Sequence, residues 1–222
     1  MSELDVKIHP QIQKGSKFYE TIQKIVGYSD VEIILEIGSS SGEGSTQALV
    51  SGMRKSSVLH CLEVSKVRFV ELQRRYKDNS NVNTYNVSSI LLTDFPSEEE
   101  IRIFYQTIKS VFNKYSLERV LGWLKQDIEY IIINNIPDGG IQQVKKINNT
   151  SIFDVILIDG SEFTGKVELD ELCGAKYILL DDIRSYKNFE NFQRLCVDFR
   201  YRLVIENNNE RNGFAVFERK EI

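Results

Sequence analysis

The sequence predicts an α/β fold built around one doubly wound, mostly parallel sheet. Two observations carry this prediction. Short apolar runs alternate with helical patterns through most of the chain, which is typical of a sheet assembled from crossover units. The last two strand-like runs, in "YRLVIENNNERNGFAVFERK", are instead joined by a polar, asparagine-rich loop, which indicates an antiparallel hairpin at the C-terminal end.

Five apolar runs are the predicted parallel strands. The segments between them are long enough to cross over, which is the usual way to join parallel strands. With the two strands of the terminal hairpin, they make one sheet. In chain order, the five runs are residues 32–38, 58–64, 82–87, 153–160 and 175–182.

Helices are expected between the strands, on both faces of the sheet. "STQALVSGMRK" and "SKVRFVELQRRYKD" follow the first and second strands, and both place apolar residues on one helical face. Residues 1–29 are predicted to form an N-terminal helical cap on a single domain of residues 1–222. Residues 94–150 form a helical insertion in which aromatic residues recur at helical spacing. Its role, as a packing layer or as a lid over a ligand, is left open.

The composition is that of an ordinary globular protein. The 28 basic and 32 acidic residues give a net charge of -4, which disfavours a nucleic-acid partner. The three cysteines are far apart and are predicted to be buried free thiols of a reducing compartment. The sequence shows no apolar signal core and no run of the roughly 20 residues that spans a bilayer. We therefore expect a cytoplasmic protein without a membrane segment, and a homodimer is left open.

The stretch "IILEIGSSSGEGST" leads from the first strand through a glycine-rich loop into a helix. Such a loop brings the backbone close to a ligand and offers free N–H groups at the helix start. Gly38, Gly42 and Gly44 do not have the G-x-G-x-x-G spacing of a dinucleotide site. Glu36, just before them, would repel a pyrophosphate and suits a cationic end of a ligand instead.

"LEIGSSSGEGST" resembles the first motif of class I S-adenosylmethionine-dependent methyltransferases, acid-x-Gly-x-Gly-x-Gly. Glu36, Gly38 and Gly42 are in place, and Ser40 stands where the middle glycine often stands. "CLEV" matches the second motif, in which an acid accepts hydrogen bonds from the ribose hydroxyls. Glu63 has that position, 21 residues after Gly42.

The resemblance covers about residues 30–220 and includes the terminal hairpin, since the family has a Rossmann-like, seven-stranded sheet with an antiparallel C-terminal strand. It implies S-adenosylmethionine as the cofactor. In "YNVSSI", after the third strand, the residues expected to flank the adenine are Val87 and Ser88. The complete set of donor-binding residues implied by the resemblance is Glu36, Gly38, Ser39, Ser40, Gly42, Ser45, Glu63, Val64, Val87, Ser88 and Asp159.

Asp159, Asp181 and Asp182 end the fourth and fifth strands, whose carboxyl ends should meet. Three carboxylates in one cleft repel each other unless something positive lies between them, and oxygen ligands favour a hard cation such as Mg²⁺. The pattern resembles catechol-type O-methyltransferases and the related cephalosporin- and macrolide-sugar-tailoring enzymes. In the catechol type, an aspartate and an Asp-Asn pair hold magnesium, and Asp182 stands here in place of the asparagine. Alternatively, Asp159 meets the methionine moiety or a backbone turn, and Asp182 caps the next helix.

Methyl transfer requires that the acceptor be aligned with the donor and lose a proton. His9 lies in the N-terminal segment and His60 within a strand, so neither suits a general base. Glu162 has the position of the catalytic lysine of the catechol-type enzymes, and Lys166 lies slightly further on. The predicted catalytic set is therefore Asp159, Glu162 and Lys166, with a solvated loop acid as the alternative for Glu162.

No Asn-Pro-Pro-Tyr or Asp-Pro-Pro-Tyr stretch follows the fourth strand, which counts against methylation of exocyclic amines. "IDGSEF" resembles a turn of compact methyltransferases that act on sugars or secondary metabolites. We therefore predict O-methylation of a hydroxyl on a small molecule or sugar, with Mg²⁺ as a candidate aid. The alternatives are a non-catalytic donor-binding or regulatory protein on the same scaffold, an RNA methyltransferase and an NAD-dependent oxidoreductase.

Overall fold

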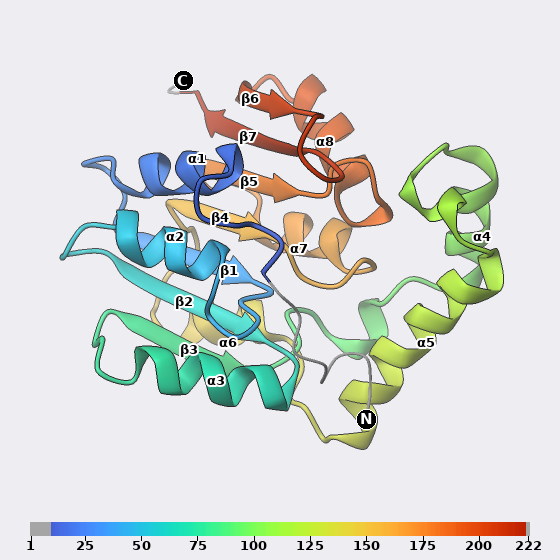
Figure 1. Cartoon of the computed structure of the whole chain (residues 1–222), viewed down its shortest axis with the longest axis horizontal. Coiled ribbons are helices and arrows are strands. Elements are labelled where there is room, and N and C mark those ends of the chain that lie inside the picture. The colour runs from blue at the N-terminus through green and yellow to red at the C-terminus, as the bar shows by residue number, and fades with distance from the viewer. Residues whose placement is uncertain (1–9, 221–222) are drawn as a thin grey trace.

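The computed structural model describes residues 10–220, which form one seven-stranded sheet (Figure 1). The strand order is β3-β2-β1-β4-β5-β7-β6. Neighbouring strands among the first five are parallel, and β7 is antiparallel to both β5 and β6. The predicted mostly parallel sheet with a C-terminal hairpin is confirmed. The strands are β1 (Ile33–Ile37), β2 (Val58–Glu63), β3 (Val82–Asn86), β4 (Val155–Ile158), β5 (Tyr177–Asp181), β6 (Tyr201–Asn207) and β7 (Phe214–Arg219).

The order of the strands reverses between β1 and β4. The chain runs outward from β1 through β2 to β3, returns to pair β4 with β1, and then continues in the opposite direction. Ligands of open α/β sheets bind outside the carboxyl ends of the strands at such a switch point. We therefore expect a ligand site at the loops after β1, β2, β4 and β5.

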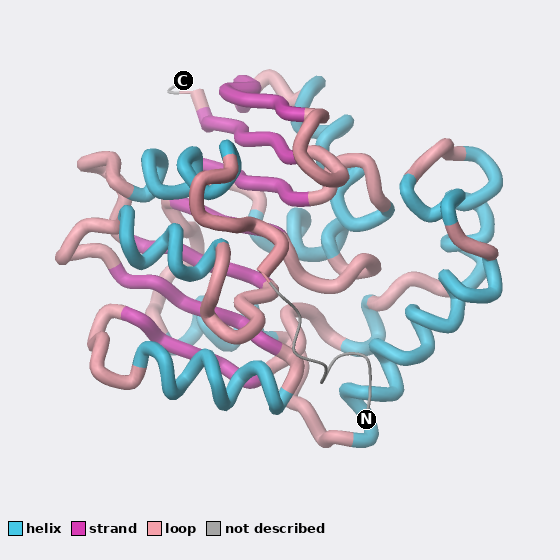
Figure 2. The backbone as a smooth tube through the Cα atoms, viewed as in Figure 1, coloured by secondary structure: helices cyan, strands magenta, loops and turns pink. Residues whose placement is uncertain are grey.

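Helices cover both faces of the sheet (Figure 2). Apolar residues of α1, α2 and α3 pack on one face with Ile34 of β1, while those of α6, α7 and α8 pack on the other face with Leu35. This alternation follows from the two-residue period of a strand. The helices are α1 (Lys17–Val26), α2 (Ser45–Gly52), α3 (Lys66–Tyr76), α4 (Glu98–Thr107), α5 (Leu117–Ile133), α6 (Gly140–Ile147), α7 (Gly165–Leu172) and α8 (Tyr186–Val197).

The insertion between β3 and α6 forms an arm beside the carboxyl edge of the sheet, at the right of Figure 1. A capping box of Ser97 and Glu100 starts α4, which ends at Thr107 and is followed by a 3₁₀ turn, Val111–Lys114. Aromatic side chains of the arm pack together and onto Tyr186 of α8. The last helix of the predicted insertion, α6, instead packs on the sheet as a crossover helix.

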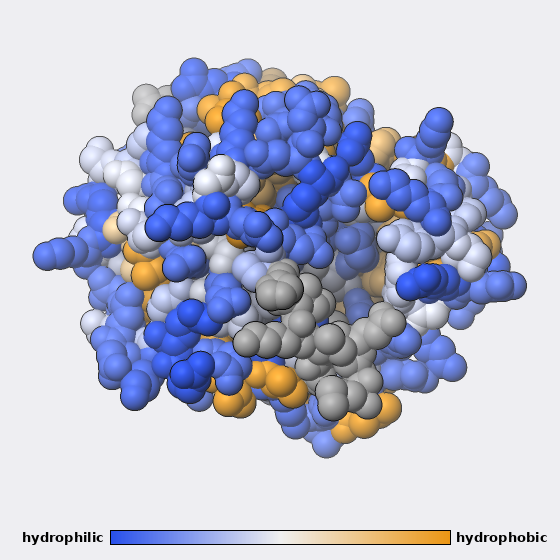
Figure 3. Space-filling view, in the orientation of Figure 1, coloured by the Kyte–Doolittle hydropathy of each residue, from blue (hydrophilic) through white to orange (hydrophobic). Residues whose placement is uncertain are grey.

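The N-terminal cap consists, in its described part, of a short segment from residue 10 and helix α1. Ser16 caps α1, and the carboxylate of Glu210, in the β6–β7 loop, accepts the N–H groups of Lys17 and Phe18. His9 lies outside the described residues. The face that carries α1, α2 and α3 is mostly hydrophilic on its outer surface, with small separate apolar patches (Figure 3).

Two other predictions concern the cysteines and the membrane. Cys61 is buried, but Cys173 and Cys196 are exposed, so the prediction of burial is wrong for these two. Both lie at a helix end, where an apolar neighbourhood in sequence does not ensure burial. Of the helices in residues 10–220, not one has the length and apolar character needed to cross a bilayer.

Candidate active site

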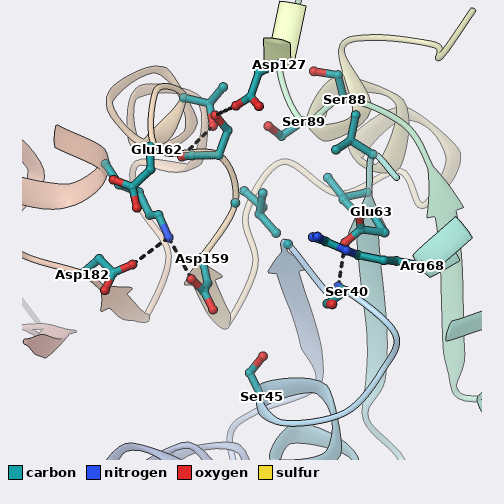
Figure 4. Close-up of a pocket in the computed structure, with 18 of the residues that line it drawn as sticks. Ser40, Ser45, Glu63, Arg68, Ser88, Ser89, Asp127, Asp159, Glu162 and Asp182 are labelled. Atoms are coloured by element: carbon teal, nitrogen blue, oxygen red, sulfur yellow. Dashed lines mark hydrogen bonds and ion pairs between the residues drawn. The ribbon is translucent and has the colours of Figure 1, made fainter. Parts of the chain in front are cut away.

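A cavity of about 350 Å³ opens at the carboxyl ends of the strands, at the predicted switch point. Its walls come from the loops after β1, β2, β3, β4 and β5 and from helix α5 of the arm. This volume lies within the roughly 300–1,000 Å³ that small-molecule sites occupy. Figure 4 shows the two ends of the cavity, with Ser40, Glu63 and Arg68 on one side and Asp159, Glu162 and Asp182 on the other.

The glycine loop after β1 approaches the loop after β4 more closely than any side chain would allow. Gly38 has a φ of 87°, and a Cβ placed on it would lie 2.1 Å from the carbonyl oxygen of Asp159. The N–H groups of Gly38 and Ser39 both donate to the carbonyl of Leu62 at the end of β2. The positive φ and the close approach to Asp159 both require glycine at position 38. The loop is thereby held against the ends of β1, β2 and β4.

Ser40 and Glu63 lie together at one end of the cavity, and both are predicted donor-binding residues. Ser40 has a φ of 48°, the left-handed conformation that glycine adopts easily, which explains why a glycine is common at this point of the motif. Its N–H donates to Glu63 Oε2 at 2.6 Å, and the N–H of Ser65 donates to Oε1 at 2.7 Å. Burial raises the pKa of Glu63, and these two hydrogen bonds oppose that rise. Each carboxylate oxygen keeps acceptor capacity for a ligand hydroxyl.

Glu36 lies behind the loop and does not line the cavity. Its side chain is fully buried, and its Oε2 accepts a hydrogen bond from Thr46 Oγ1 at 2.7 Å. Ser39 and Gly42 do not line the cavity either; Gly42 has a φ of 80° and its carbonyl accepts from Tyr76 Oη at 2.7 Å. These three residues, predicted to take part in donor binding, lie behind or within the loop and away from the cavity surface.

The other predicted donor contacts do line the cavity: Ser45, Val64, Val87 and Ser88. Val87 and Ser88 follow β3, and the start of α6 packs directly on them. A Cβ on Gly140 would lie 2.6 Å from Cγ1 of Val87 and 2.9 Å from the carbonyl oxygen of Ser88. The crossover helix thus sets the position of this wall.

Asp127 and Glu162 lie at the opposite end of the cavity, where Figure 4 shows them near each other. Ser161 Oγ donates to Asp127 Oδ2 at 2.5 Å. Burial raises the pKa of Asp127 to about 6, the charge of Glu162 adds to the rise, and the Ser161 hydroxyl opposes it. Burial also raises the pKa of Glu162, against the nearby ammonium of Lys187. With a pKa of about 6, Asp127 is poised to exchange protons near neutral pH.

Asp159, Asp181 and Asp182 converge as the strand ends predicted, with one potential ligand atom of each within 4.8 Å of the others. Two cations lie among them. Lys187 Nζ is 2.9 Å from Asp159 Oδ1 and 3.1 Å from Asp182 Oδ2. Arg211 contacts Asp181 Oδ2 at 2.8 Å and Asp182 Oδ1 at 3.2 Å. The positive charge that three carboxylates require therefore comes from the protein itself.

Two residues considered as proton carriers lie elsewhere. Lys166 points to the surface, pairs with Glu190 at 3.2 Å and does not line the cavity, so it lies apart from Asp159 and Glu162, the other residues of the predicted catalytic set. His60 lies within β2, in the strand as predicted; its side chain is buried beside Tyr85, and burial lowers its pKa to about 4. It is therefore neutral at physiological pH and is enclosed by the sheet.

No protein-family model and no curated protein matches this sequence. Solved structures match it in fold. An O-methyltransferase from Bacillus cereus in complex with SAH is 14% identical, with a TM-score of 0.59 over 95% of this chain and 84% of that chain. A methyltransferase from Geobacter sulfurreducens is 10% identical, with a TM-score of 0.57 over 94% of this chain and 81% of that chain.

The chain has the methyltransferase fold. A protein from Staphylococcus aureus, provisionally named as a caffeoyl-CoA O-methyltransferase, shares this fold with a TM-score of 0.56, at 12% identity over 97% of this chain and 86% of that chain. Similarity at such identities establishes the architecture, and the activity has to be argued from the site. In this methyltransferase fold, the cavity lies where the strand order reverses.

Within the described residues, four charged residues that line the cavity were missed in the sequence: Glu43, Arg68, Asp127 and Lys187. Asp127 had a visible signal, because it is an acid on the apolar face of α5, spaced three residues from buried Leu124 and four from buried Ile131. The signal for Lys187 was weaker: a lysine in the first turn of a helix is unfavourable, because its charge opposes the helix dipole. Neither signal reveals which other residues it meets.

Proposed function

We propose that this protein transfers a methyl group from S-adenosylmethionine to a hydroxyl group of a small molecule or sugar. The observation that carries the proposal is one cavity with two chemically different ends. A glycine loop and Glu63 form one end, and two carboxylates of raised pKa, Asp127 and Glu162, form the other. The structural neighbours, among them the SAH complex from Bacillus cereus, support the same reading.

The loop residues suit the donor. Glu63 would accept hydrogen bonds from the ribose hydroxyls, with Ser40 and Ser45 beside it and Val87 and Ser88 against the adenine. Bound S-adenosylmethionine supplies an electrophilic methyl group on sulfur, which the acceptor oxygen displaces in line. The close approach of Gly38 to the backbone of Asp159 brings the donor loop beside the loop that carries Glu162.

Asp127 is the proposed general base. Its pKa of about 6 makes it a carboxylate at neutral pH that is still basic enough to take the hydroxyl proton. Ser161 orients it through the 2.5 Å hydrogen bond, and Glu162 stands beside it as the second candidate, which the sequence had indicated. Because Asp127 comes from α5, the arm would complete the site at its acceptor end.

Calorimetric titration with S-adenosylmethionine tests the donor site. The wild-type protein should bind it saturably, while Glu63→Ala should weaken binding roughly 10- to 100-fold, since it removes a carboxylate that holds the ribose. Glu71→Ala, on the exposed side of α3, is the matched control and should bind like the wild type. NAD⁺ should not bind.

Unchanged affinity of a folded Glu63→Ala variant would contradict the donor site. Donor binding without methylation of any hydroxyl compound, sugar or RNA would instead favour the non-catalytic alternative. Product analysis with labelled donor distinguishes O-methylated small molecules from methylated RNA.

A further inference from the structure

The carboxylate cluster after β4 and β5 is built with its own cation. Lys187 is 5% exposed and lies between Asp159 and Asp182, and Arg211 reaches Asp181 and Asp182 from the β6–β7 loop. Both cations come from outside the strands whose ends they join. The cluster is therefore assembled from four parts of the chain, and its charges are largely balanced within the protein.

Lys187 is placed there by several contacts of the neighbouring backbone. Asn188, the next residue in α8, donates to the carbonyl of Ile158 at 3.0 Å and to that of Asp181 at 2.6 Å, which fastens α8 to the ends of β4 and β5. A Cβ on Gly165 would lie 2.0 Å from the carbonyl oxygen of Lys187, so α7 packs directly against its backbone. The ammonium group is thus delivered to the cluster by a rigid frame.

The energetic balance also indicates that Lys187 is held by the carboxylates. It lies in the first turn of α8, where the helix dipole disfavours a positive charge, and it is almost fully buried. Asp159 and Asp182 offset both costs, and they raise the pKa of Lys187 although burial alone would lower it. Asp182 also adopts a φ of 55°, a conformation that an aspartate tolerates when its side chain is held.

A magnesium ion does not fit this arrangement. It would need oxygen ligands at about 2.1 Å in octahedral geometry and would keep several waters. The oxygens of Asp159 and Asp182 that face each other are hydrogen-bonded to the ammonium of Lys187, which stands between them. A divalent ion bridging these carboxylates would have to displace that ammonium and would leave it as a buried positive charge beside the metal.

We propose that Lys187 permanently takes the place of the divalent metal at the ends of β4 and β5, so that this site excludes Mg²⁺ and works without it. Two of the ammonium N–H groups serve Asp159 and Asp182, and one remains for an oxygen of a ligand in the cavity that Lys187 lines. On the proposed function, that oxygen belongs to the acceptor. An acceptor with a single hydroxyl then suffices, because no metal has to be chelated.

Binding of Mn²⁺ tests the proposal directly, with neither donor nor acceptor present. Electron paramagnetic resonance measures free Mn²⁺ during titration of the full chain, and calorimetry repeats the titration with Mg²⁺. The wild type should show no saturable binding at millimolar metal. Lys187→Ala should bind Mn²⁺ at least roughly tenfold more tightly, because the carboxylates lose their resident cation.

Lys187→Gln provides a second variant that keeps a hydrogen-bonding side chain, should Lys187→Ala fold poorly. Lys166→Gln, which removes an exposed lysine of the adjacent helix, should behave like the wild type. Tight Mn²⁺ binding by the wild type would overturn the proposal. So would the absence of binding to folded lysine variants, since the lysine would then not be what keeps the metal out. Neither result depends on whether the protein is a methyltransferase.

Discussion

At the scale of single residues, the carboxylate of Asp127 is held in a state suited to proton transfer. It is partly buried, it accepts one short hydrogen bond from Ser161, and it lies beside the second acid, Glu162. Burial and the charge of Glu162 raise its pKa from the ordinary value of 3.8 to about 6, and the Ser161 hydroxyl opposes that rise. The same shift has consequences for turnover and for stability, and the two can be measured separately.

The rate should follow the ionisation of Asp127. If the carboxylate is the base, kcat/KM falls about tenfold for each pH unit below about 6 and levels off above it. Asp127→Asn should lower kcat by about 10²- to 10⁴-fold, with little change in the affinity for S-adenosylmethionine. A pH–rate profile of both proteins checks this. A variant that keeps the wild-type rate and profile would assign the base role to Glu162 instead.

The free energy of unfolding should fall as the pH rises, whereas the rate should increase. The folded-state pKa of Asp127 is above its unfolded value, so stability is lost as the pH rises through about 6 and the buried group ionises. Asn carries no charge and still accepts the Ser161 hydrogen bond. Asp127→Asn should therefore raise the Tm at pH 8 by roughly 2–4 °C and leave it nearly unchanged at pH 4. An equal change at both pH values would contradict the ionisation argument.

At the scale of elements, the loops after β1 and β4 depend on one close backbone contact. Gly38 approaches the backbone of Asp159 at the place where the glycine loop begins. Two further long-range ties are the fastening of α8 to β4 and β5 by Asn188 and the capping of α1 by Glu210. Each connects the end of one element to another, so the geometry of the site depends on how elements dock as well as on their local structure.

Two glycine substitutions distinguish the docking of elements from their local structure. Gly38→Ala should destabilise the fold by at least about 2 kcal/mol and abolish donor binding, because the new Cβ meets backbone and the φ of 87° is strained for alanine. Gly122→Ala, within α5, meets no atom within 4 Å and should stabilise by about 0.5–1 kcal/mol through helix propensity. Urea denaturation checks both. Equal stabilities would contradict the close approach.

At the scale of the whole molecule, a mostly parallel sheet positions a cavity, and an added arm supplies its far wall. Short apolar runs and helical faces predicted the seven strands and the helices on both faces, since these patterns depend on neighbours in the sequence. The arm was visible as an insertion, yet its division at Thr107 and the assignment of α6 to the sheet depend on packing. The choice between a packing layer and a lid for the arm, and the homodimer, stay open questions.

The sequence by itself determined the glycine loop, the acid at the end of β2 and the convergence of Asp159, Asp181 and Asp182, because each depends on local spacing along strand ends. Only the tertiary structure decided which acids face the cavity and what neutralises the aspartates. Lys187 and Arg211 follow Asp159 by many residues and meet the cluster only when α8 and the β6–β7 loop pack against β4 and β5. Electrostatic partners depend on distance in space, which spacing in a sequence does not specify.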